Sequence, residues 1–252
     1  MKSSKLYCYY FIFLFFFCFT VQSQVNNLLS CKLSKIGPTY DNNWNRNGYD
    51  TITDFIYLYK DIKLISRPIV VDFYDNGKLT GSELHSRYFV HHKDSLYGLL
   101  FDTTMKIIKQ RVHIDSGSVE RSLFNNDIEK DFKTLKIQTQ QLNVVIDQFS
   151  FKDIYFINDK EDTSKNTILT LTFSNLMKTH PISISTYMDS LRFSKLVEIR
   201  TDQPERFFKK EKYTMAPYFF IYRMEPYESN EKDMIMNFIN IYVKEIGLNI
   251  DN

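Results

Sequence analysis

Residues 68–78 read Pro-Ile-Val-Val-Asp-Phe-Tyr-Asp-Asn-Gly-Lys, and this stretch decides the fold. Its first seven residues are mostly β-branched or aromatic, a composition typical of strands. The pair Asn76-Gly77 favours the positive φ angles of a two-residue hairpin turn. We therefore predict a hairpin with one strand over 68–74 and a long return strand from Leu79 to His91.

Further strands are predicted on the C-terminal side of this hairpin. Residues 93–95 form a turn into a third strand of the same meander over 96–101, and residues 105–114 are predicted to add a fourth. Residues 168–173 alternate apolar and polar side chains, as in a sheet with one solvated face. The remaining predicted strands cover residues 144–146, 151–157, 167–173, 182–187, 196–200 and 218–223.

Three segments have helical features. Ile52, Phe55, Ile56 and Tyr59 favour a helix over 51–60, although the same residues also permit a strand. Ser118 is the predicted N-cap of a second helix that extends to Phe132. The clearest helix begins after Asn230, ends at Gly247 and has one apolar stripe, formed by Ile235, Phe238, Ile239, Tyr242 and Ile246.

Strands outnumber helices, and no alternation of single strands with single helices is visible. The sequence therefore predicts an α+β fold in which a large, mainly antiparallel sheet, a meander plus further strands, is packed by a few helices. The amphipathic C-terminal helix is one of them.

The N-terminus has the pattern of a secretory signal peptide. Lys2 and Lys5 precede an uncharged run over 6–21, which at 16 residues is short for a membrane span. We predict a signal peptide over 1–23, cleaved after Ser23, with an uncleaved anchor as the alternative. Residues 24–50 are rich in turn formers and predict an irregular arm. Residues 51–252 are predicted to form a single α+β domain.

Cysteine usage bears on processing. Residues 28–31, Leu-Leu-Ser-Cys, resemble the acylation motif of bacterial lipoproteins, but polar residues separate them from the apolar run, so we expect Cys31 to be an unmodified thiol. The other two cysteines lie in the signal, so a mature monomer has no internal disulfide. No Asn-X-Ser/Thr acceptor occurs, which favours a bacterial exported protein in the periplasm or at the cell surface.

Charge and motifs exclude several classes of function. With 32 basic and 30 acidic residues, the chain lacks the positive surplus of a nucleic-acid-binding protein. It has no nucleophile elbow, zinc-protease motif, phosphate loop or dinucleotide fingerprint. The sequence therefore predicts no cofactor and no metal site.

Histidines supply the best candidates for catalysis. His85 and His91 share a strand face but lie roughly 20 Å apart, too far to bind one metal ion. His92, beside Asp94, is instead a candidate to meet His113 from a neighbouring strand in a metal or acid–base site. His91, Asp72, Asp102 and Asp115 are further candidates. The alternative is that these histidines are solvated groups at strand ends.

A basic cluster supplies the best candidate for binding. Arg206, Lys209 and Lys210 flank Phe207 and predict contact with an anionic surface or partner. Glu205 and Glu211 partly neutralise this charge. A charged loop with anchored rings is therefore the alternative.

Taken together, these features favour a non-enzymatic exported protein that binds an unidentified protein or envelope partner through its sheet face or loops. A periplasmic immunity-type protein is one concrete version. Membrane contact is expected only through an uncleaved signal or acylation of Cys31. The alternative is an extracytoplasmic hydrolase with a non-contiguous His/Asp site.

Overall fold

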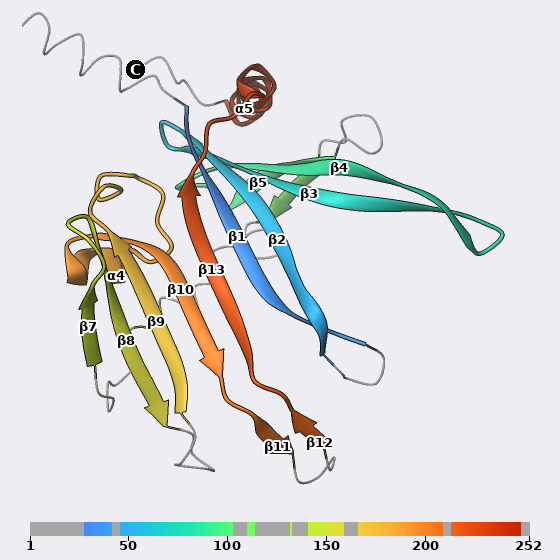
Figure 1. The fold of residues 1–252 in the computed structure, drawn as a ribbon. Helices are drawn as coiled ribbons and strands as arrows, with labels where there is room; N and C mark the ends of the chain where they lie inside the picture. Colours follow the sequence, from blue (N-terminus) through green and yellow to red (C-terminus); the bar gives the residue numbers. More distant parts are fainter. Residues whose placement is uncertain are drawn as a thin grey trace, which may run out of the picture.

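The computed structural model describes residues 28–41, 46–102, 110–113, 132, 141–158, 166–208 and 213–247. Within them, eleven strands form one sheet in the order β6-β5-β4-β3-β2-β1-β13-β10-β9-β8-β7, and each adjacent pair is antiparallel (Figure 1). Two described helices accompany this sheet. The predicted sheet-dominated α+β architecture with few helices is confirmed.

The predicted hairpin is the pair β3 (Ile62–Asp75) and β4 (Lys78–His92). Asn76 and Gly77 connect the two strands with φ angles of 50° and 77°, so the Asn-Gly pair adopts the positive φ values expected of it. β5 (Tyr97–Asp102) and β6 (Gln110–His113) complete the meander. β6 is shorter than the fourth strand predicted over 105–114, part of which lies outside the described residues.

The irregular arm predicted over 24–50 is wrong for its described part. Residues Leu29–Tyr40 form β1, at the centre of the sheet between β2 and β13, and β2 begins at Arg46. Gly37 and Pro38 are not turn residues, because both pair with β2 as part of β1. The turn formers in this segment therefore did not indicate a loop.

The helix predicted over 51–60 is also wrong, because β2 continues to Tyr59. The physical reason is burial on both faces of the sheet. Ile56 and Tyr57 point to opposite faces, yet they are 0% and 1% exposed. A strand covered on both sides loses its alternating pattern, and its apolar residues then fit a helical spacing by chance.

The other half of the sheet largely follows the prediction. Strands β7 (Gln141–Val145), β8 (Ser150–Asn158), β9 (Asn166–Ser174), β10 (Lys195–Gln203) and β13 (Tyr218–Pro226) lie at or near the predicted segments. Buried residues alternate with half-buried ones along β9, as expected. β11 (Arg206–Phe208) and β12 (Tyr213–Met215) form a separate two-stranded sheet.

The strand predicted over 182–187 is wrong. Its last residues begin the short helix α4 (Thr186–Arg192), because the Ser185 hydroxyl accepts a hydrogen bond from the backbone N–H of Met188 at 3.2 Å and caps the helix. Ile182 and Ile184 are nevertheless buried, so their apolar character serves packing rather than strand pairing. The helix predicted over 118–132 lies outside the described residues except for Phe132.

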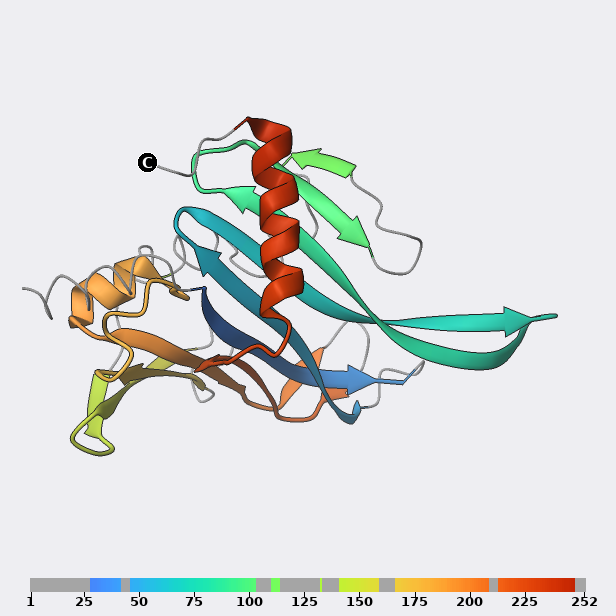
Figure 2. The same cartoon turned by 90° about the horizontal axis from the view of Figure 1, so that it is seen from above.

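The predicted C-terminal helix is α5 (Lys232–Ile246). Gly247 ends it in the left-handed conformation, with φ 67°, as the sequence indicated. Glu231, rather than Asn230, occupies the N-cap position and makes no side-chain capping bond. Helix α5 lies across β3 and β4 (Figure 2).

Two apolar cores sandwich the meander strands. The helix-side core joins Ile235, Phe238, Ile239 and Tyr242 of α5 to the strand residues Tyr57, Ile62, Leu64, Tyr88, Val90, Leu99 and Phe101. The second core, on the opposite face, contains Cys31, Leu33, Ile56, Ile65 and Phe89 together with apolar residues of β8, β9, β10 and α4. Strands β2 to β4 therefore contribute alternate residues to two different cores.

Candidate functional site

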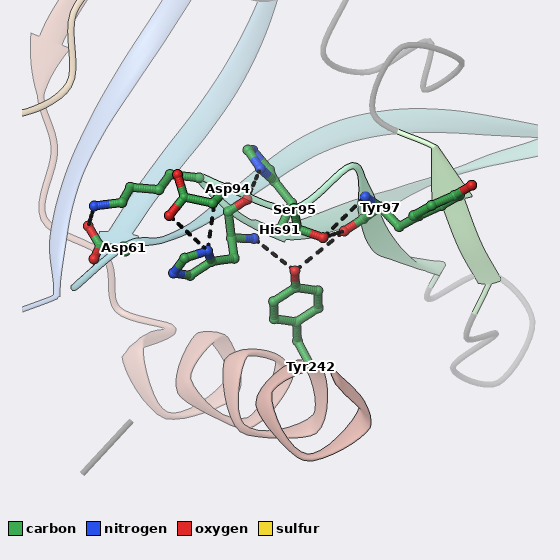
Figure 3. Close-up of polar contacts among 8 residues, drawn as sticks. Asp61, His91, Asp94, Ser95, Tyr97 and Tyr242 are labelled. Carbon is green, nitrogen blue, oxygen red and sulfur yellow. Dashed lines mark hydrogen bonds and ion pairs between the residues drawn. The ribbon is translucent and has the colours of Figure 1, made fainter. Parts of the chain in front are cut away.

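Two of the predicted catalytic histidines, His91 and His92, end β4 at its turn into β5, and Figure 3 shows the polar contacts of this turn. His91 is 5% exposed, its Nδ1 lies 3.2 Å from the carbonyl oxygen of His92, and its ring packs 5.5 Å from that of Phe89. His92 Nδ1 accepts a hydrogen bond from the backbone N–H of Asp94 at 3.2 Å. These contacts shape a tight turn.

His92 and His113 do not meet. The register pairs His91 with Gly98 and Tyr97 with His113, so β5 lies between the two histidines and Tyr97 occupies the intervening position. The His113 ring packs edge-on against Tyr97, with the ring centroids 5.0 Å apart. Strands two positions apart are roughly 10 Å apart, and Tyr97 lies between these two histidines.

The carboxylates proposed as partners are scattered. Asp94 is exposed, and its Oδ2 lies 3.8 Å from His92 Nδ1. Asp72 accepts a hydrogen bond from the Ser82 hydroxyl far out on the β3–β4 hairpin, and Asp102 pairs in register with Arg87. Asp115 lies outside the described residues. Within the described ranges, no three His, Cys, Asp or Glu residues are grouped so as to hold a metal ion.

Tyr242, which the sequence placed in the apolar stripe of the C-terminal helix, also contacts this turn through its hydroxyl. Its hydroxyl accepts a hydrogen bond from the backbone N–H of His92 at 2.8 Å and donates one to the carbonyl of Tyr97 at 3.4 Å (Figure 3). Its side chain is fully buried. This hydroxyl ties the last turns of α5 to the β4–β5 turn, which is a structural role.

A pocket of about 420 Å³ opens beside this turn, between β5, β6 and the end of α5. None of the predicted catalytic histidines lines it. Its aromatic wall, Tyr97, is already contacted by the chain's own Arg111, whose guanidinium carbon lies 4.5 Å from the ring centroid. The pocket therefore does not join the histidines to a carboxylate.

Cys31 is fully buried in the second core. Burial raises the pKa of its thiol to about 12, although the positive charge of Lys63 acts in the opposite direction. At neutral pH the group is a protonated thiol inside a strand, which makes it a poor nucleophile.

Part of the predicted basic cluster is visible. Arg206 lies on β11, where its guanidinium donates to the hydroxyl of Thr167 at 3.5 Å, and Phe207 is 56% exposed. Lys209 and Lys210 lie outside the described residues. Neither described helix is long and apolar enough to span a bilayer.

A charged group that the sequence did not reveal lies on the face of the second core. Asp54 is fully buried and receives two hydrogen bonds from Arg67, Nε to Oδ1 at 2.6 Å and Nη2 to Oδ2 at 2.9 Å. Lys35 projects from the same face of β1, with Nζ 5.8 Å from the Tyr222 ring centroid. Burial lowers the pKa of Lys35 to about 8, and nearby Arg67 also lowers it, whereas Asp54 raises it.

This pKa predicts a pH-dependent stability. Lys35 has its ordinary pKa of 10.5 in the unfolded chain and about 8 in the folded one. Between these values the unfolded state binds more protons at Lys35, so the contribution of this group to stability rises with pH. We expect the parent chain to gain stability relative to a Lys35→Met variant between pH 8 and 10, by no more than about 3 kcal/mol in the free energy of unfolding measured by urea titration.

The variant serves as the reference because burial raises the pKa of Cys31, Tyr57 and Tyr155 to about 12. Ionisation of this thiol and these phenols in the unfolded chain opposes folding in the same pH range, and it does so equally in both chains. The same slope in the variant and the parent chain would show that another group is responsible.

A group of exposed apolar side chains lies on the β3–β4 hairpin, away from the β4–β5 turn. β2 pairs with β3 only up to Ser66, and β5 pairs with β4 only from Arg87 onward. Residues 67–86 therefore leave the sheet as a two-stranded ribbon, which projects well beyond the rest of the fold (Figures 1 and 2). We call residues 67–86 the ribbon.

Both faces of the ribbon carry apolar side chains. Val70 and Leu84 pair directly across one face and are 66% and 73% exposed. Phe73, on the other face, is 44% exposed. Near the tip, Tyr74 pairs with Leu79, and these side chains are 64% and 57% exposed. Polar side chains, such as the paired Asp72 and Ser82, lie beside these apolar groups, which together form an exposed apolar patch.

Sequence comparisons add no relative: no protein-family model matches the chain, and no curated protein is significantly similar to it.

Proposed function

We propose that the chain is an exported binding protein that recognises a partner protein through the ribbon. The observation that carries this proposal is the exposure of apolar side chains on both faces of a hairpin that has left its sheet. An isolated two-stranded hairpin is marginally stable in water. A partner that covers Val70, Leu84 and the tip would remove apolar surface from water and stabilise the ribbon.

Charge indicates the kind of partner. Between Val70 and Leu84 the ribbon has three acidic residues, Asp72, Asp75 and Glu83, and one basic residue, Lys78. Such a surface is repelled by anionic lipid headgroups and by nucleic acid phosphates. It fits a protein groove that is apolar at its centre and basic at its rim.

Export is supported by the signal-like pattern of residues 1–23, and the position of Cys31 argues against acylation. Acylation would require Cys31 to be the first residue of the mature chain, whereas the described strand β1 begins at Leu29, and the Ser30 hydroxyl donates to the carbonyl of Tyr227. A buried Cys31 within a strand favours cleavage after Ser23 in the periplasm or at the cell surface.

The hydrolase alternative has less support. His91 is buried on one face, His92 and His113 are separated by Tyr97, and the nearby pocket is lined by none of them. A general base needs to lie within hydrogen-bonding reach of its partner. The contacts of His91 and His92 favour structural roles at the β4–β5 turn.

The test compares a ribbon variant with a matched control. V70T/L84T keeps β propensity but removes apolar surface, whereas L96T/L176T alters two leucines that are 66% and 71% exposed elsewhere. The partner is captured from the envelope with the exported chain, purified, and titrated calorimetrically. We expect V70T/L84T to weaken binding by about 10-fold or more and L96T/L176T to leave it unchanged.

Two results would contradict the proposal. Equal affinities for the two variants would show that the ribbon is not the recognition element. The second result is that V70T/L84T weakens the binding of the chain to itself but not its binding to any other protein. The ribbon would then be a self-association surface.

A further inference from the structure

The sheet ends at β7, which is a different kind of surface from the ribbon. β7 pairs with β8 along one side, from Gln141 opposite Tyr155 to Val145 opposite Phe151. In the described part of the chain no strand pairs with its other side, and Figure 1 shows β7 as the outermost strand. The backbone along that side offers N–H and C=O groups to a further strand.

This strand lacks the features that prevent edge pairing. Residues 141–146 read Gln-Leu-Asn-Val-Val-Ile and contain no charge and no proline. The next residue, Asp147, is turned back into the β7–β8 turn, where it accepts hydrogen bonds from the Phe149 backbone N–H at 2.7 Å and the Ser150 hydroxyl at 2.8 Å. Natural edge strands are commonly protected by Lys or Pro.

Exposed apolar side chains accompany the uncharged backbone. Val144, Val145, Ile146 and Phe149 are 43%, 74%, 48% and 42% exposed. Val144 and Val145 point to opposite faces of the sheet, so a strand added to β7 would cover apolar surface on both faces. Pairing would therefore bury side chains as well as satisfy backbone groups.

The opposite end of the described sheet is protected. β6 has four residues, among them Arg111 and His113, and these side chains contact the Tyr97 ring. A head-to-tail assembly that joins β7 of one copy to β6 of the next would meet this charged, short strand. The two ends of the sheet therefore differ in their capacity to accept a strand.

We propose that β7 pairs antiparallel with β7 of a second copy, so that two sheets join across a two-fold axis. In such an interface the same strand of two copies lies side by side, so any charged residue on it would lie near its own equivalent and be repelled. A strand without charge avoids this repulsion when it pairs with itself. The same strand offers a different protein no charge pattern to recognise, so a second copy is the better occupant. The proposal rests on β7 alone and is independent of the ribbon.

The test measures mass and hydrogen exchange of the exported chain. Light scattering after size exclusion at about 10 µM protein should give twice the chain mass, as expected for a micromolar or tighter dimer. Backbone amides of 143–145 should exchange more slowly as the protein concentration rises. V144K/V145K, which places two lysines on the strand, should be a monomer with unchanged circular dichroism.

Matched variants separate this surface from others. L96K/L176K adds the same charge at two exposed leucines and should remain a dimer, as should V70T/L84T in the ribbon. If V144K/V145K fails to fold, V144T/V145T keeps the β-branched shape and should weaken the dimer by about 10-fold. A monomeric parent chain, larger open assemblies, or a dimer that only the ribbon variant dissociates would overturn the proposal.

Discussion

Replacing Arg67 with methionine is expected to lower the free energy of unfolding by about 3–5 kcal/mol, because the substitution leaves the carboxylate of Asp54 buried without its charged partner. The Asp54 side chain is 0% exposed, and Arg67 donates two hydrogen bonds to it. The expected loss is large relative to the total stability of a domain. Urea unfolding at pH 7, followed by circular dichroism, measures it.

Two further variants separate the buried pair from the general effect of losing an arginine. Arg223→Met removes a pair with Glu198 in which the arginine is 44% exposed, and it should cost less than about 1 kcal/mol. The double variant D54L/R67M removes both charges and should recover part of the loss. If the double variant were less stable than R67M alone, the cost would not come from an unpaired carboxylate.

Phe238→Ala is expected to have a comparable effect, about 3–5 kcal/mol, because it opens a cavity between α5 and the sheet. The Phe238 ring is 2% exposed, and its centroid lies 4.7 Å from those of both Tyr88 and Phe101. Thermal or urea unfolding of the purified chain measures the loss.

The control for this cavity is Phe207→Ala. Phe207 is 56% exposed on β11, so its truncation should change the free energy of unfolding by less than about 0.5 kcal/mol. If Phe207→Ala cost as much as Phe238→Ala, burial against α5 would not be the source of the effect. The crystal structure of Phe238→Ala should show the cavity.

Local signals in the sequence predicted the elements that local chemistry determines. The Asn76-Gly77 turn and the end of α5 at Gly247 were predicted, because both positions require positive φ angles. β1 was missed for a non-local reason: it pairs with β13, whose residues lie almost 200 positions later in the chain, and a segment's own sequence does not record such a distant partner. β2 was missed because burial on both faces removed its alternating pattern.

For the candidate sites, too, the sequence predicted local features but not those that depend on strand pairing. The sequence showed that His91, His92 and His113 lie near strand ends, but it did not show that Tyr97 would occupy the position between His92 and His113. It showed the apolar run of the hairpin, but not that β2 and β5 stop pairing at Ser66 and Arg87. Exposure of Val70 and Leu84 depends on where neighbouring strands end, which no local pattern records.

The ribbon and β7 belong to opposite halves of the strand order, with β2, β1, β13, β10, β9 and β8 between β3 and β7. A dimer joined at β7 therefore carries its two ribbons at its two far ends. If the partner is displayed in many copies on a surface, the first ribbon to bind raises the effective concentration of the second. The pair can then be held with an avidity well above the affinity of one ribbon, without any further contact.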